Sequence, residues 1–338
     1  MFDHLRAIAI MMVIATHCPP PTSTLTGFTF NEHHPIISLL AGATTIFVFL
    51  AGFFYEHIYR RRWTALALLR HRATMLIPPY LFISLLLIAH GLEPGVRGLS
   101  PQSGSPLGDV ALWLIFGTAG PATWFVPFIL ALLLFTPGFA RFATAPPRIQ
   151  LAILAALLVL GIAAPRHPFA VGANVAHFAF YYAFGIFWAV HRARLEPVVR
   201  RGPVLVLLAL GLAGAAALQY AIGAPALYGA PEPLLHARDI MVVRKIILIA
   251  LLIGVLSRWV ARPVAPLRVI AELSFGLFFV HQPVLLWLVR AAKTLPIAGM
   301  SPALLAVVLW VATVALSLLI LAAGRALLGR HAKLLLGA

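Results

Sequence analysis

The chain contains 338 residues, of which 62% are hydrophobic and only 10% are charged. Soluble domains carry about 25% charged residues, so this composition excludes a soluble globular protein and predicts an integral membrane protein. The net charge of +16 is typical of the cytoplasmic loops of such a protein, so we expect contact with membrane lipid and no nucleic acid partner.

Apolar segments predict about ten transmembrane helices, because a helix needs about 20 mostly apolar residues to span a bilayer. In chain order these segments are residues 4–18, 36–55, 74–91, 109–136, 149–164, 173–190, 203–221, 240–257, 273–290 and 302–323. A break between Gly117 and Pro121 interrupts the fourth segment. We therefore expect an all-α, polytopic transmembrane helical bundle, in which residues 1–338 form a single membrane-embedded domain with no fused soluble domain.

The placement of basic residues predicts the orientation of the bundle. If the N-terminus is cytoplasmic, most of the 25 lysine and arginine residues fall in cytoplasmic loops, including the run from Arg60 to Arg62. We therefore expect both termini on the cytoplasmic side. Arginine outnumbers lysine, which with the high alanine and leucine content hints at a GC-rich bacterial genome and hence at a bacterial cytoplasmic membrane.

Two ionisable residues share one face of the first predicted helix, whose sequence over residues 3–17 is DHLRAIAIMMVIATH. His17 follows Arg6 by about three helical turns, a rise of roughly 16 Å. Asp3 lies about one turn below Arg6 and is suited to hold its guanidinium group. Ionisable side chains in a bilayer usually face a protein interior or a watery path, so this pair predicts a functional site. The alternative is that Arg6 reaches lipid headgroups and that His17 satisfies a backbone carbonyl.

A second group of arginines follows in the segment YRRRWTALALLRHRATMLIPPY, residues 59–80. Arg70 and Arg72 are expected just below the third predicted helix, at a depth close to that of Arg6. Guanidinium groups bind pairs of phosphate oxygens, so such a cluster suits a polyphosphate such as that of coenzyme A. The arginines at 60–62 are explained by loop orientation alone.

The single cysteine, Cys18, excludes an intrachain disulfide, a cysteine-based zinc site and an iron–sulfur cluster. We expect no bound metal. Cys18 adjoins His17 but projects about 100° away from it on a helix, which disfavours a Cys–His pair.

Five segments together resemble the acyltransferase 3 family of integral membrane proteins, which acylate glycans and other hydroxyl-bearing molecules. The first-helix segment resembles the family's signature, in which ten residues separate an arginine or lysine from a histidine. The other four segments keep the family's order over nearly the whole chain. IFVFLAGFF at 46–54 resembles the family's aromatic pattern before Ser-Gly-Phe, and RATMLIPPY at 72–80 resembles its arginine-rich helix start. TWFVPFILAL at 123–132 resembles its Trp-Phe segment, and ELSFGLFFVHQPVLL at 272–286 resembles its Ser-Tyr-x-x-Tyr-Leu-x-His motif.

Two positions depart from the family pattern. Ala51 stands where the family usually has serine, so a hydroxyl group at that point cannot be essential here. Met75 stands where the second arginine of an Arg-x-x-Arg pair is usual. Binding of the acyl donor is therefore expected to depend on Arg70 and Arg72 instead.

The resemblance implies a membrane O-acyltransferase with no permanently bound cofactor. The donor would be an acyl-coenzyme A, above all acetyl-coenzyme A, with its phosphates held by Arg6, Arg70 and Arg72. The acceptor would be a hydroxyl group of a carbohydrate or a related molecule. His17 would act as general base or would carry the acyl group transiently. Supporting roles are expected for Asp3, Trp124 and His281, of which the last two would shape the acceptor pocket; the alternative for His281 is a structural role at a helix end.

A second class of function also fits intramembrane ionisable residues. A proton-coupled transporter would use Arg6, His17, Asp239 and His281 as a relay. The sequence shows no repeated halves of the kind that many transporters have, which favours the enzyme. A third reading is a flippase or membrane scaffold in which the polar residues only fix helix packing.

Overall fold

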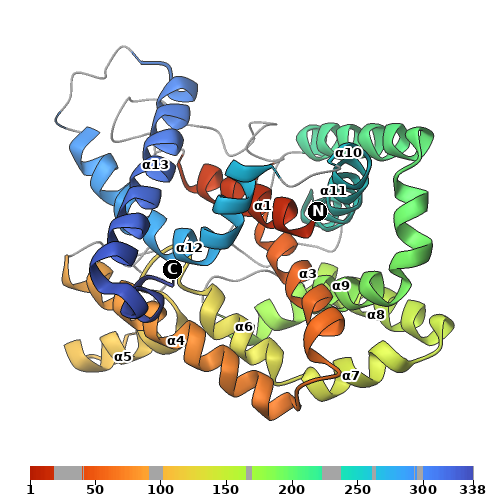
Figure 1. Ribbon diagram of the computed structural model, residues 1–338, viewed down its shortest axis with the longest axis horizontal. Helices are drawn as coiled ribbons and strands as arrows, with labels where there is room; N and C mark the ends of the chain where they lie inside the picture. Colours follow the sequence, from red (N-terminus) through yellow and green to blue (C-terminus); the bar gives the residue numbers. More distant parts are fainter. Residues whose placement is uncertain are drawn as a thin grey trace.

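The computed structural model describes residues 1–18, 40, 42–90, 102–164, 170–222, 237–260, 264–292, 294 and 300–337, without the side chains of residues 220, 222, 237–240 and 302. The regular structure in these ranges is entirely helical (Figure 1). In chain order the helices are α1 (Phe2–His17), α3 (Thr44–Phe54), η1 (Tyr55–Tyr59), α4 (Ala65–Ala89), α5 (Pro106–Phe116), α6 (Phe125–Leu133), α7 (Thr136–Thr144), α8 (Pro147–Ala163), α9 (Val171–Val199), α10 (Gly202–Ile222), α11 (Ala237–Trp259), α12 (Ala265–Ala292), α13 (Pro302–Leu328), η2 (Gly329–His331) and α14 (Ala332–Leu336).

The all-α prediction is confirmed for the described residues, but the expected count of about ten spanning helices is not. Five helices are long and apolar enough to cross a membrane, namely α4, α9, α10, α12 and α13, and the bent pair α6 and α7 would make a sixth. α1, α3, α5 and α8 are shorter, and α11 carries Arg244 and Lys245 within its length. The expected segment at 36–55 begins outside the described residues.

Local sequence signals explain where several helices begin and end. Thr64, Ser105 and Ser301 each accept a hydrogen bond from a backbone N–H in the first turn of the helix that follows. Gly117 ends α5 with a φ of +70°, a conformation that costs glycine little. The predicted break in the fourth segment is therefore present, and α6 begins after it, at Phe125.

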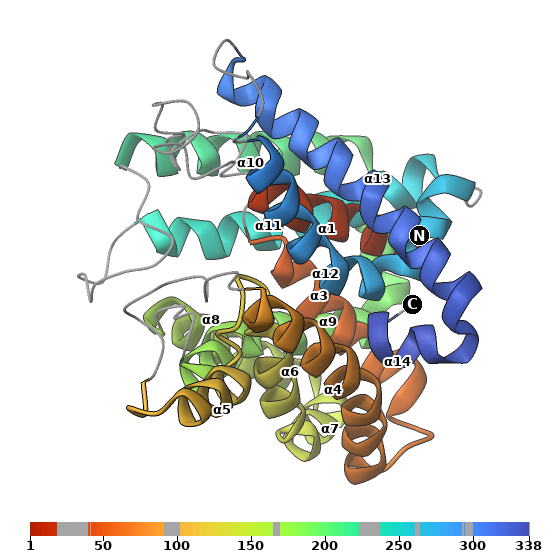
Figure 2. The same cartoon turned by 90° about the vertical axis from the view of Figure 1, so that its left-hand side faces the viewer.

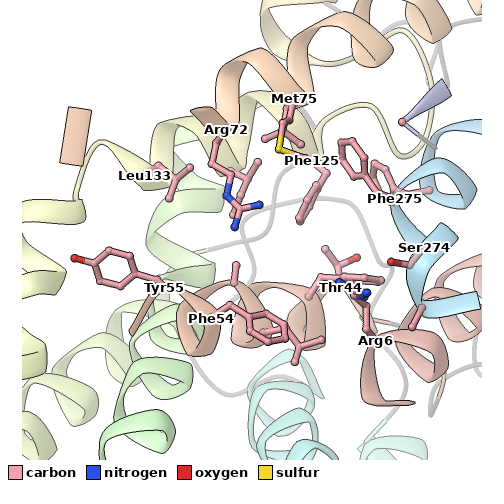
Figure 3. Close-up of a pocket in the computed structure, with 18 of the residues that line it drawn as sticks. Arg6, Thr44, Phe54, Tyr55, Arg72, Met75, Phe125, Leu133, Ser274 and Phe275 are labelled. Carbon is pink, nitrogen blue, oxygen red and sulfur yellow. The ribbon is translucent and has the colours of Figure 1, made fainter. Parts of the chain in front are cut away.

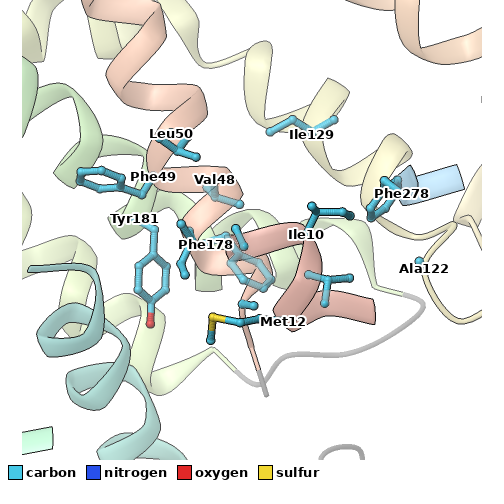
Figure 4. Close-up of a cluster of buried hydrophobic side chains, with 14 of the residues drawn as sticks. Ile10, Met12, Val48, Phe49, Leu50, Ala122, Ile129, Phe178, Tyr181 and Phe278 are labelled. Atoms are coloured by element: carbon cyan, nitrogen blue, oxygen red, sulfur yellow. The ribbon is translucent and has the colours of Figure 1, made fainter. Parts of the chain in front are cut away.

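α1 lies near the centre of the bundle, between α12 on one side and α11 on the other, with α3 beside it (Figure 1). Its buried side chains include Leu5, Ile10 and Ile14, all with no exposed surface. Figure 4 shows Ile10 in a cluster with Phe49 of α3 and Phe178 of α9. Arg6 and His17 are therefore held on a helix that is fixed by packing on several sides.

Two glycines allow α3 and α9 to pack against each other more extensively than any other helix pair. A Cβ atom on Gly52 would lie 2.0 Å from the carbonyl oxygen of Tyr182, and one on Gly185 would lie 2.0 Å from that of Phe49. Small residues at such a crossing let two backbones approach closely, as is usual between membrane helices. This contact fixes one wall of the cavity described below.

The outer faces of several helices are apolar and exposed. Leu207 and Leu210 of α10 and Leu319 of α13 are each more than 60% exposed. A soluble protein rarely shows so much apolar surface, whereas lipid-facing helices require it. These helices therefore present an apolar exterior that suits lipid.

Candidate functional site

A cavity of about 560 Å³ lies among α1, α3, η1, α4, α6, α12 and the segment from α13 to α14. Its walls are mainly aromatic and aliphatic, and Figure 3 shows Phe54, Phe125, Phe275 and Leu133 around it. Polar groups occur at a few places on these walls. A pocket of this size and character is typical of a site for an extended small molecule.

Arg6 and Arg72 enter the cavity from opposite walls, one from α1 and the other from α4 (Figure 3). Arg6 Nη2 lies 3.4 Å from Asp3 Oδ1, and its buried Nε has no hydrogen-bond partner among the described residues. The guanidinium carbon of Arg72 lies 4.7 Å from the ring centroid of Tyr59. These contacts orient both guanidinium groups, which retain N–H donors for an anion.

Arg70 is placed differently from its neighbour. The sequence suggested a loop position below the third helix, but α4 begins at Ala65 and includes both Arg70 and Arg72. Residues two apart on a helix do not share a face. Arg70 is accordingly exposed and is not part of the cavity lining, whereas Arg72 is.

Both departures from the family pattern lie on the cavity. Ala51 of α3 and Met75 of α4 are lining residues, and Figure 3 shows Met75 beside Arg72. Sequence reasoning missed two other cations on this lining, Arg325 of α13 and Lys333 of α14. Spacing in the sequence offered no signal for them, because they reach the cavity from the opposite end of the chain.

His17 lies beside His281, which the sequence placed only in a supporting role. Nδ1 of His17 is 3.0 Å from Nε2 of His281, and the two rings are parallel, with centroids 5.2 Å apart. His281 has no exposed surface. It lies within α12, which continues past Pro283 to Ala292, so a role at a helix end is wrong.

The hydrogen bonds of His281 select which nitrogen of His17 carries a proton. Nδ1 of His281 lies 2.9 Å from the carbonyl oxygen of Leu277, and a carbonyl only accepts, so Nδ1 of His281 is the donor. In a neutral ring the other nitrogen, Nε2, is then an acceptor. His17 therefore donates from Nδ1, which puts the basic lone pair of a neutral His17 on its Nε2.

The ring of Phe278 on α12 connects the cavity lining to the histidine pair. Phe278 lines the cavity, and its ring centroid is 6.2 Å from that of His281. Phe125 also lines the cavity and lies 5.2 Å from Phe278. Neither His17 nor His281 belongs to the cavity lining, so the cavity does not extend along α1 as far as the histidine pair.

Trp124 belongs to the packed core rather than to the cavity lining. It precedes α6, is 7% exposed, and stacks on Phe178 with ring centroids 5.6 Å apart. Its neighbour Phe125 reaches the cavity instead.

Several other polar groups of the described chain lie away from this cavity. Within the described ranges, no group of three or more His, Cys, Asp or Glu side chains is arranged to hold a metal ion. The side chain of Asp239, expected in a proton relay, lies outside the described residues. Arg244 and Lys245 of α11 are almost completely buried.

Comparison with known proteins identifies the family. A family model described as an acyltransferase domain matches residues 2–322, which includes the cavity's Arg6 and Arg72 and the histidine pair. No curated protein and no solved structure matches the chain. Because the match covers nearly the whole sequence and its first and late motifs meet at one place in the fold, the chain belongs to the acyltransferase 3 family of membrane acyltransferases.

Proposed function

We propose that the protein is an O-acyltransferase that takes an acetyl group from acetyl-coenzyme A on the cytoplasmic side. It transfers this group to a hydroxyl group of a glycan or a related acceptor in a bacterial cytoplasmic membrane. One observation carries the proposal: a single helix, α1, places Arg6 in a basic cavity and His17 beside a buried histidine about three turns away.

The cavity suits the donor in charge and in shape. Arg6 and Arg72 face each other across it, which favours a ligand with several phosphate groups. The remaining walls are mostly apolar and suit a flexible arm such as pantetheine. We exclude Arg70 from this site because its side chain is exposed and lies off the lining.

The reaction needs a base at the far end of α1. His17 Nε2 takes the proton of the acceptor hydroxyl while the oxygen of that hydroxyl attacks the thioester carbonyl carbon. The carbon–sulfur bond then breaks, and the departing thiolate of coenzyme A takes the proton from His17. In the alternative course, Nε2 itself attacks the thioester carbonyl carbon and the carbon–sulfur bond breaks, which releases the thiolate of coenzyme A. The acceptor oxygen then attacks the same carbon, the bond to Nε2 breaks, and the hydroxyl proton passes to the thiolate.

The ring of Phe278 defines a requirement of this proposal. The thioester must pass this ring to reach His17, because Phe278 lines the cavity and contacts His281 whereas His17 does not line it. Rotation of one aromatic side chain is a local motion that opens such a contact without rearranging the helices. Donor binding would supply the free energy for it.

The test is an assay of purified protein in detergent with labelled acetyl-coenzyme A and a panel of envelope glycans. His17→Ala should reduce coenzyme A release and acyl transfer by about 10² to 10⁴ fold. His90→Ala is the control, because His90 is exposed and does not line the cavity. Full turnover in His17→Ala would contradict the mechanism, and substrate counterflow without coenzyme A turnover would favour a transporter.

A further inference from the structure

The segment from α13 to α14 folds back against the bundle beside the cavity. α14 packs against α4 and α12, as Figure 2 shows for α14 and α4. Ala332 has no exposed surface and Leu336 is 9% exposed. A Cβ atom on Gly337, whose φ is +72°, would lie 2.9 Å from the ring of Phe275. Apolar packing therefore holds this segment in place.

This segment brings two cations to the cavity. Arg325 and Lys333 both line the cavity, whereas Arg330, between them in sequence, does not, although all three residues are exposed. Neither Arg325 nor Lys333 forms an ion pair with a carboxylate in the described part of the chain. Loop orientation explains basic residues at a cytoplasmic helix end, but it does not predict that two of these three line the same cavity as Arg6 and Arg72.

The charges around the cavity are unbalanced. Arg6, Arg72, Arg325 and Lys333 come from four different helices, and Glu272 is the acidic residue among the lining side chains of the described chain. The carboxylate of Glu272 is held by Arg268, with Nε 2.9 Å from its oxygen. Like charges that share one cavity repel one another, and a bound anion with several charges relieves this repulsion.

We propose that Arg325 and Lys333 bind phosphate groups of the acyl donor, so that the α13 to α14 segment completes the donor site. This inference rests on the proposed function, because it takes the nucleotide end of coenzyme A as the ligand. Arg325 and Lys333 line the same cavity into which Arg6 and Arg72 extend (Figure 3), so a polyphosphate bound there would meet cations from both ends of the chain. Donor binding thereby stabilises the docked position of the segment.

A phosphate group could also come from an anionic lipid, so the experiment separates the two sources. Binding of free coenzyme A is measured by calorimetry in lipid nanodiscs, since free coenzyme A binds without any chemistry at His17. One set of nanodiscs contains only phosphatidylcholine, and the other also contains phosphatidylglycerol. The proteins are the wild type, Arg325→Ala with Lys333→Ala, the charge-retaining Arg325→Lys, and the matched control Arg330→Ala.

The double variant should bind coenzyme A about tenfold or more weakly in both lipid compositions, because charge-assisted hydrogen bonds are lost. Arg330→Ala should stay within about twofold of the wild type, and Arg325→Lys should lose less than the double variant. Wild-type affinity in the double variant overturns the role of Arg325 and Lys333 but leaves the proposed donor intact. An equal loss in Arg330→Ala, or a loss confined to phosphatidylglycerol, also overturns it. A wild-type protein that binds no coenzyme A overturns both this inference and the proposed donor.

Discussion

Nδ1 of His17 lies 3.0 Å from Nε2 of His281, although 264 positions separate the two residues in the sequence. The contact joins α1 to α12 and places a fully buried ring behind the proposed catalytic one. The carbonyl of Leu277 fixes the proton on the far side of His281. These two successive hydrogen bonds orient the ring of His17, as hydrogen bonds to the far nitrogen orient histidines that bind metals.

Loss of His281 should therefore lower the turnover rate strongly and weaken binding of the acyl donor only slightly. In His281→Ala we expect kcat to fall by about 10 to 100 fold with little change in the KM for acetyl-coenzyme A, because His17 loses the acceptor that sets its tautomer. His281→Gln keeps an oxygen that can accept from His17 and should be the milder variant. Steady-state kinetics on both variants provide the check. An equal fall in kcat in the two variants would indicate a packing role for His281 instead.

Substitutions of the two neighbouring arginines of α4 should have different effects on the KM for acetyl-coenzyme A. Arg72→Ala and Arg6→Ala should each raise the KM for acetyl-coenzyme A by about tenfold or more, since each removes a charge-assisted contact in the cavity. Arg70→Ala should change it by less than about twofold, because Arg70 is exposed. Initial rates at varied donor concentration distinguish these outcomes. If Arg70→Ala raised the KM as much as Arg72→Ala, the donor would lie elsewhere on α4.

The ring of Phe278 should limit the length of the acyl group. Phe278→Leu and Phe278→Ala enlarge the space between the cavity and His281, so butyryl-coenzyme A should gain activity relative to acetyl-coenzyme A. Removing a buried phenylalanine ring costs about 3 to 5 kcal/mol of stability, so the leucine variant guards against unfolding. An unchanged ratio of the two donors in a folded variant would show that the acyl group does not pass this ring.

The helix crossing of α3 and α9 should tolerate no side chain at its glycines. Gly52→Ala and Gly185→Ala should each destabilise the protein by about 1 to 3 kcal/mol, because the new methyl group meets a backbone carbonyl. Gly214→Ala on α10 is the control, since a Cβ there meets nothing within 4 Å and alanine favours a helix. Thermal unfolding followed by size-exclusion chromatography gives the comparison. Matching midpoints for all three variants would contradict the close crossing.

The orientation of the bundle can be tested with single cysteines in a Cys18→Ala background. Arg330→Cys should react with a membrane-impermeant thiol reagent only after the membrane is permeabilised, because we expect the segment from α13 to α14 on the cytoplasmic side. Ser103→Cys, in the loop before α5, should react in intact cells. The reverse labelling pattern would place the basic cavity outside, where acyl-coenzyme A is absent, and would end the proposed donor assignment.

Local patterns in the sequence account for several features that the structure contains. The break after α5 follows from Gly117, whose positive φ suits glycine, and the helical capping groups are serine and threonine residues at the expected positions. The common face of Arg6 and His17 follows from helical periodicity alone. That same periodicity separates Arg70 from Arg72, so the different exposure of these two residues was predictable once both were placed within one helix.

The amino-acid sequence by itself determined that this is a helical membrane protein of the acyltransferase 3 family, because composition, helical period and ordered motifs are properties of the chain read locally. Only the tertiary structure decided that His281 lies behind His17 and that Arg325 and Lys333 join Arg6 and Arg72 around one cavity. These partners come from opposite ends of the chain. Their meeting depends on how the helices pack, through contacts such as the glycine crossing of α3 and α9, and packing over such sequence distances leaves no periodic trace.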